Sequence, residues 1–169
     1  MKPISISLSG TTPLLCGRPA SEVLPEGQPP RAQAALRLYL DTGGHPVIPS
    51  LNLLRAITGA ARERGRSSAE IIHHLGIQER EIRIGSQRSW VVDSRSIRIP
   101  NTGERGICHR PRFDEWRLTC TLLHDPSGLQ EEELRALVDL AGQRIGVGDY
   151  RPERGGPFGR FAVTLWGGS

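Results

Sequence analysis

The chain has 169 residues, of which 37% are hydrophobic and 5% aromatic, and its formal net charge is +4. This length suits one domain with a modest core. No segment approaches the roughly 20 apolar residues that span a bilayer, and the first residues lack the apolar stretch of a secretory signal. We therefore expect a cytoplasmic protein with no membrane partner.

Short alternating segments dominate the first half of the chain. An apolar–polar alternation is typical of a half-buried strand. Two segments follow it, 4–9 and 36–40, and residues 47–48 would return as a short partner strand of the second. Residues 16–30 are rich in Pro and predict a surface loop, whereas residues 41–44 predict a tight turn. A helix is predicted from Ser50, as its N-cap, to Gly65, and a second short helix over 68–75.

The second half begins with a β-like region. Apolar residues alternate with polar residues and Arg from Ile82 to Arg117, with a turn at 101–103. Ser127 and Gln130 resemble a capping box at the start of the clearest helix, whose apolar stripe runs from 134 to 145. The remaining strands are predicted over 118–122 and 161–165.

The order of these elements predicts the fold class. Without its insertions the chain is β-α-β-β-α-β, the ferredoxin-like arrangement of an α+β protein with two helices on one face of an antiparallel sheet. We expect a single domain over 1–169. Residues 82–110 would form an inserted Arg-rich β-hairpin, and a glycine-rich loop would precede the last strand.

The basic residues are almost all arginine, since Lys2 is the only lysine. A GC-rich genome would explain that ratio, but the distribution is more informative. The segment from Arg80 to Arg117 holds nine Arg against five acids. Arg pairs bidentately with phosphate and stacks on bases, so a segregated basic segment favours a polyanionic partner.

Two stretches could contact nucleic acid. The loop over 146–160 holds five Gly and three Arg. Glycines permit close approach to a phosphate chain, although the same composition fits a structural turn. In the β-region, Trp90 stands among arginines and suits base stacking, although it could equally pack inward. The predicted nucleic-acid-binding residues are Arg88, Trp90, Arg95, Arg98, Tyr150, Arg151, Arg154, Gly155, Gly156, Gly159 and Arg160.

We predict that the protein is not an enzyme. The enzymatic alternative is a metal-independent endoribonuclease in which His73, His74 or His109 acts as base and a nearby Arg stabilises the transition state. The three cysteines lack the spacing of a zinc site and read as reduced thiols, so no metal or cofactor is expected. As a third alternative, Trp116, Phe158 and Trp166 could anchor a protein-interaction module, for instance of phage origin, or fill the core.

Three stretches resemble the RAMP superfamily, the "repeat-associated mysterious proteins" of CRISPR effector complexes. Residues 4–15 are similar to its opening strand. Residues 45–56 resemble its "IPGSSLKGALR" helix entry, with Ser50 and Arg55 in matching places and Asn52-Leu53 where the family often has Lys-Gly. Residues 146–160 are similar to its C-terminal glycine-rich loop. The chain also resembles small phage and prophage proteins built on the same plan.

The resemblance implies a ferredoxin-like, RRM-related fold and a role with RNA. Backbone subunits of the family bind guide RNA along a filament and insert a hairpin "thumb" between nucleotides, and processing members cut RNA. The region from Ile82 to Arg117 would correspond to the thumb and neighbouring strands. Together with the charge pattern, this predicts a binding protein for single-stranded RNA or DNA that forms a homo-oligomer or filament along the strand.

Overall fold

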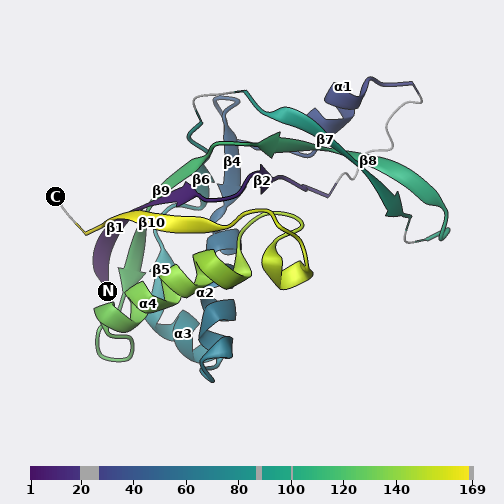
Figure 1. Ribbon diagram of the computed structural model, residues 1–169. Helices are drawn as coiled ribbons and strands as arrows, with labels where there is room; N and C mark the ends of the chain where they lie inside the picture. The colour runs from purple at the N-terminus through teal and green to yellow at the C-terminus, as the bar shows by residue number, and fades with distance from the viewer. Residues whose placement is uncertain (20–26, 87–88, 100, 168–169) are drawn as a thin grey trace.

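The computed structural model describes residues 1–19, 27–86, 89–99 and 101–167. It combines helices with antiparallel sheets, as the predicted α+β class requires (Figure 1). None of the helices in these ranges is long and apolar enough to cross a membrane.

A four-stranded antiparallel sheet forms the centre of the molecule. Its order is β10-β1-β9-β5, and the strands span Lys2–Gly10 (β1), Leu75–Ile77 (β5), Arg117–His124 (β9) and Phe161–Trp166 (β10). β1 pairs with β9 from Lys2 opposite His124 to Ser9 opposite Arg117. The strands predicted from alternation at both ends of the chain are therefore present, and they lie side by side.

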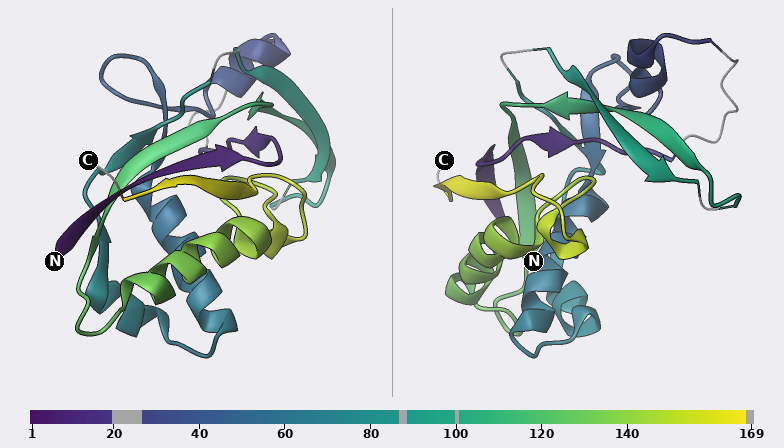
Figure 2. Two further views of the ribbon diagram at one scale, coloured as in Figure 1. Left: turned by 60° about the vertical axis from the view of Figure 1, so that its left-hand side comes forward. Right: turned by 45° about the vertical axis from the view of Figure 1, so that its right-hand side comes forward.

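The helices pack against one face of this sheet (Figure 2). They are α2 (Ser50–Glu63), α3 (Ser68–His74) and α4 (Glu131–Leu140), which continues as a π-helical turn over Ala141–Ile145. The core lies between sheet and helices, because Ile6 and Leu8 of β1 and Leu53 and Ile57 of α2 are fully buried in one cluster. The serines of β1 alternate with these residues and face away from the helices.

Two predicted helix caps are wrong. Ser50 is the first residue of α2, and Pro49 occupies the N-cap position without a side-chain hydrogen bond. The capping box is also absent, since α4 has Gln130 at its N-cap and the Ser127 hydroxyl donates to the Asp125 carboxylate instead, at 2.8 Å. At α2 a proline occupies the N-cap position. Before α4 the hydrogen bond to Asp125 engages the Ser127 hydroxyl, which is therefore not a cap.

The end of α4 approaches β10 very closely. The Gly146 N–H donates to the Ala141 carbonyl, five residues back, which makes this turn a π-helix. Gly142 lies directly against Phe161, and a Cβ at Gly142 would collide with the Phe161 carbonyl oxygen. The Val147 N–H also donates to the Gly159 carbonyl at 3.0 Å, which closes the glycine-rich loop (residues 146–160) at its base.

A long β-hairpin projects from the body of the protein (Figure 1). Its strands are β7 (Val91–Arg98) and β8 (Arg105–Phe113), and β2 (Leu14–Leu15) pairs with β8. The predicted turn at 101–103 joins the two long strands. Helix α1 (Pro30–Ala35) packs on the hairpin and was missed from the sequence, which predicted a loop over 16–30 and no element over 31–35.

A third, small sheet lies beside β9 and the start of α2. It has the order β3-β4-β6, with strands Tyr39–Leu40, Pro46–Pro49 and Glu81–Arg83. The predicted strand over 36–40 is therefore shorter than expected. Asp41 fixes the β3–β4 turn because its carboxylate accepts hydrogen bonds from the Gly43 and His45 backbone N–H groups and from Arg83.

We expect acid to destabilise the connection between β9 and α4 through Asp125. Hydrogen bonds from the Ser127 N–H, the Ser127 hydroxyl and His74 lower the pKa of Asp125 to about 2. A lowered pKa means that the carboxylate stabilises the fold above about pH 4 and that this contribution is lost as pH falls toward the folded-state value. Melting temperature followed by circular dichroism should fall less steeply with acidification in Asp125→Asn. Glu132→Gln, at an exposed position on α4, is the control. Parallel curves for Asp125→Asn and the wild type would contradict this.

Candidate nucleic-acid interface

The hairpin lies over the glycine-rich loop, and aromatic rings of the loop meet arginines of the hairpin. The Arg95 guanidinium lies 4.8 Å from the centre of the Phe158 ring and 5.8 Å from that of Tyr150. The Arg110 guanidinium lies 5.1 Å from the Tyr150 ring centre. These cation–π contacts hold the middle of the hairpin against the loop. Two predicted site residues, Arg95 and Tyr150, are thus brought together.

Carboxylates neutralise the arginines in this contact. Asp93 is 6% exposed and accepts hydrogen bonds from Arg95, at 3.1 Å to Nη2, and from Arg112, at 3.3 Å to Nη1. Burial by itself raises the pKa of Asp93, but the hydrogen bonds from the two arginines outweigh it and hold the pKa below its ordinary value. Arg151 pairs in the same way with Glu153, at 2.8 Å. These arginines therefore offer little net charge to a polyanion.

Arg110 is the most deeply placed arginine of the hairpin. Its side chain is only 12% exposed, and its Nε lies 2.8 Å from the Asp149 Oδ2. The pair is close enough for an ion pair but poorly aligned for a hydrogen bond, so the buried Nε and Nη1 have no hydrogen-bond partner among the described residues. Because this guanidinium is so little exposed to solvent, we infer that it packs the hairpin against the loop and does not bind an external anion.

The glycines of the loop serve its own folding. A Cβ at Gly156 would collide with the Tyr150 carbonyl, and a Cβ at Gly159 would collide with the Val147 carbonyl. Gly159 also has a φ of +76°. Gly155 has a φ of +77° but faces open space. The sequence suggested that these glycines allow a phosphate chain to approach the backbone. At Gly156 and Gly159, however, the group that comes close is a carbonyl of the same loop, as expected for a structural turn.

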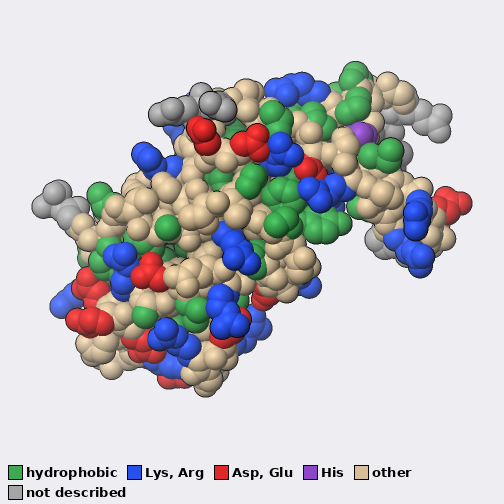
Figure 3. All heavy atoms as spheres, in the orientation of Figure 1, with side chains coloured by type: hydrophobic (Ala, Val, Ile, Leu, Met, Phe, Trp, Pro, Cys, Tyr) green, Lys and Arg blue, Asp and Glu red, His purple; other side chains and the backbone are tan. Residues whose placement is uncertain are grey.

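Exposed arginines without an ion-pair partner are found at the outer end of the hairpin (residues 96–99 and 101–107). Arg98 and Arg105 are both exposed and stand directly opposite each other across β7 and β8. Neither makes an ion pair within the described ranges of the chain. Ile107, in the same region, is 68% exposed. Figure 3 shows basic side chains on this projecting end, with an acidic side chain beside them. Sequence analysis named Arg98 but missed Arg105, which only the register of the hairpin reveals.

The other predicted residues are dispersed. Arg154 and Arg160 are exposed in the glycine-rich loop and have no carboxylate partner among the residues described. Trp90 is partly buried, and the Arg31 guanidinium of α1 lies 4.0 Å from its ring centre, so one face of the indole is covered. Arg88 lies outside the described residues.

The histidines of the ribonuclease alternative occupy two separate places. His73 and His74 end α3, where the His74 Nδ1 lies 3.2 Å from Asp125, whereas the His109 Nδ1 lies 2.7 Å from the Ser94 hydroxyl on the hairpin. Figure 1 shows α3 and the hairpin at opposite ends of the molecule. The structure does not bring the two groups together. Across the described ranges there is also no cluster of three or more His, Cys, Asp and Glu that could hold a metal ion.

The aromatic residues considered as interface anchors pack mostly inward. Trp116 and Phe158 are 4% and 5% exposed. Trp166 is partly buried, and its Nε1 donates to Glu131 at 3.0 Å. Core packing therefore accounts for Trp116 and Phe158.

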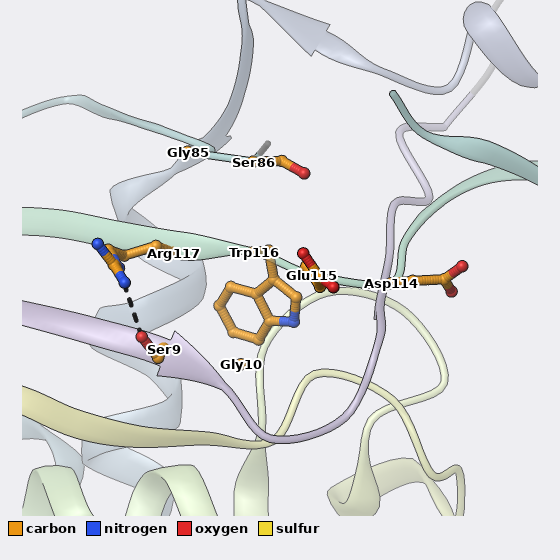
Figure 4. Close-up of a pocket in the computed structure, with 8 residues that line it drawn as sticks. All are labelled: Ser9, Gly10, Gly85, Ser86, Asp114, Glu115, Trp116 and Arg117. Atoms are coloured by element: carbon orange, nitrogen blue, oxygen red, sulfur yellow. Dashed lines mark hydrogen bonds between the residues drawn. The ribbon is translucent and has the colours of Figure 1, made fainter. Parts of the chain in front are cut away.

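An open groove of about 460 Å³ adjoins Trp116 (Figure 4). It lies where β1 ends and β9 begins, and Arg117 on its wall donates to the Ser9 hydroxyl at 3.4 Å. Asp114 and Glu115 line the same groove. Its mixed charge gives no preference for an anionic ligand.

Comparison with known proteins identifies a fold and no sequence family. No family model matches the chain, and no curated protein matches it. Among solved structures, the chain is similar to a chain in the cryo-EM structure of the Type III-B Cmr-beta complex bound to cognate target RNA, with a TM-score of 0.61 and 9% identity. The match covers 97% of this chain and 59% of the other, so the protein spans about three-fifths of that chain's length. At this identity the likeness concerns the fold, and it agrees with the RAMP-like fold that the sequence resemblance implies.

Proposed function

We propose that this protein binds single-stranded nucleic acid, in the first place RNA, through the outer end of the hairpin. The observation that carries the proposal is the pair Arg98 and Arg105. Like charges directly opposite each other across two strands destabilise a sheet. Neither guanidinium forms an ion pair with a carboxylate of the described residues, although Glu104 is next to Arg105 in the sequence. A phosphate backbone would offset the repulsion between the two arginines, because Arg recognises phosphate bidentately.

Other features support the same reading. Exposed Ile107 lies within the outer end of the hairpin and offers apolar contact to bases next to the phosphate contacts. Arg154 and Arg160 supply further exposed charge. The fold is similar to that of a chain from an RNA-bound complex.

We further propose that residues 1–169 form a single ferredoxin-like domain, with residues 82–110 as the inserted hairpin. The order β10-β1-β9-β5 and the position of α2 and α4 on one face of the sheet support this topology. Self-association along the strand and binding without cleavage complete the proposal. Light scattering with and without a long strand tests the first, and incubation with labelled RNA in EDTA tests the second.

A titration at several salt concentrations tests the binding site. With fluorescence anisotropy on labelled oligouridine, log K should fall by roughly 0.7 per decade of salt for each phosphate contact. Arg98→Gln/Arg105→Gln should therefore flatten the slope by about 1.4 and weaken binding roughly tenfold or more at low salt. The melting temperature should hardly change, because both side chains are exposed.

The matched control is Arg55→Gln/Arg64→Gln, which removes two exposed arginines of α2 and its end and keeps the net charge equal to that of the hairpin variant. This variant should retain nearly wild-type binding. Equal weakening in both variants would mean that net charge alone attracts the strand. Absence of binding to oligouridine and oligothymidine at low salt would overturn the proposed function.

A further inference from the structure

A small pocket lies between the glycine-rich loop and the start of α2. Its volume is about 160 Å³, and all of its lining residues belong to the described part of the chain. Tyr39 of β3, Pro49 at the end of β4, Asn52 in the first turn of α2, and Asp149 and Arg151 of the loop contribute to its walls. Pockets for drug-sized ligands hold about 300–1,000 Å³. This pocket is therefore of a size for one planar ring system.

One wall carries a carboxylate in a fixed orientation. Asp149 Oδ1 accepts a hydrogen bond from the Tyr150 N–H at 3.0 Å, and Oδ2 lies 2.8 Å from Arg110 Nε. The carboxylate also lies against Gly17, where a Cβ would collide with it. Each carboxylate oxygen has two lone pairs, so the group keeps capacity to accept from a ligand. A ligand in contact with it must present N–H or O–H donors.

Other walls carry hydrogen-bond donors. The Arg151 guanidinium is held by Glu153 and by the Gly148 carbonyl, to which Nη1 donates at 3.1 Å. Asn52 and Tyr39 are partly buried, and neither side chain makes a hydrogen bond within the described ranges. The Asn52 amide and the Tyr39 hydroxyl are therefore available to hydrogen-bond with a group that enters the pocket.

We propose that the pocket takes one guanine base of the bound strand. Guanine has two adjacent donors, N1–H and the N2 amino group, which suit a carboxylate, and it has acceptors at O6 and N7, which suit an amide or a guanidinium. Uracil presents one ring N–H and adenine one amino group, so neither offers the paired donors. Ile48 and Pro49 supply an apolar wall for the ring. This inference rests on the proposed function.

Strands that differ in one base test the proposal. Anisotropy titrations compare oligouridine with the same strand carrying a central guanosine, and with one carrying inosine, which lacks the N2 amino group. We expect the guanosine strand to bind about 5- to 100-fold more tightly than oligouridine and the inosine strand to lose most of that gain. Asn52→Ala should reduce the guanosine preference and leave oligouridine binding unchanged. Leu51→Ala, at an exposed neighbouring position outside the pocket, is the control and should keep the preference.

The outcomes separate the pocket from the strand-binding surface. Binding of oligouridine without any preference for guanosine overturns the pocket and leaves the proposed function standing. Absence of oligouridine binding overturns the proposed function. In that case calorimetry with guanosine monophosphate decides the pocket: binding that is lost in Asn52→Ala supports a guanine site for free nucleotide, and no heat of binding overturns it.

Discussion

Gly159→Ala should destabilise the protein by about 3 kcal/mol or more, because the new Cβ combines a left-handed backbone with a collision. The φ of Gly159 is +76°, and its Cβ would overlap the Val147 carbonyl. That carbonyl belongs to backbone and cannot turn aside like the end of a side chain. The melting temperature should fall by roughly 6–12 °C in a scanning calorimeter.

The matched control for this prediction is Gly155→Ala. Gly155 has nearly the same φ, +77°, but faces open space. Its substitution should cost only the left-handed backbone preference, about 1–2 kcal/mol. A difference between the two variants therefore measures the close approach at the base of the loop. Equal melting temperatures would show that Gly159 is required only for its backbone angle.

Asp93→Ala should also lower stability strongly, by about 2–3 kcal/mol, since it leaves Arg95 without a carboxylate partner and Arg112 with the exposed Asp114 alone. The expected loss of stability is smaller than for a fully buried ion pair because each arginine side chain is about one-third exposed to solvent. The lowered pKa of Asp93 means that its contribution is present above about pH 4 and is lost at lower pH. Thermal unfolding at neutral and acidic pH measures both effects.

Asp114→Ala is the control for Asp93→Ala. Asp114 pairs with the same Arg112, at 2.7 Å, but its side chain is 47% exposed. A surface ion pair contributes about 0–1 kcal/mol. The control should therefore melt within a few degrees of the wild type. If Asp93→Ala behaves like Asp114→Ala, the buried carboxylate contributes no more to stability than the exposed one.

The parts of the fold that the sequence predicts are those with one buried face. The alternation in β1 and the apolar stripe of α4 both report burial directly, because every second or every third to fourth residue enters the core. Helix α1 has no such stripe, since only Ala34 is buried, and its sequence contains no signal of periodicity. The cap at Ser127 failed because Asp125, two residues earlier, competes for its hydroxyl.

The candidate site was harder to predict because charge depends on partners far away in the sequence. From the sequence alone, Arg95 and Arg151 were predicted to be free to bind phosphate. In the structure they form ion pairs with Asp93 and Glu153. Arg105 was overlooked because its position opposite Arg98 follows only from the hairpin register. The pocket at Asn52 joins segments from β3, α2 and the loop, and no local pattern links them.

The hydrogen bond between Val147 and Gly159, together with the contact of Gly142 with Phe161, gives the glycine-rich loop the character of an Ω-loop, whose ends meet and whose interior is filled by its own residues. The entropy of closing such a loop grows only logarithmically with its length, by about 0.6 kcal/mol per doubling. Residues added beside Gly155, where the backbone faces open space, therefore extend the loop at low cost. The outer turn of the loop can therefore lengthen toward a ligand, while the base of the loop stabilises the fold.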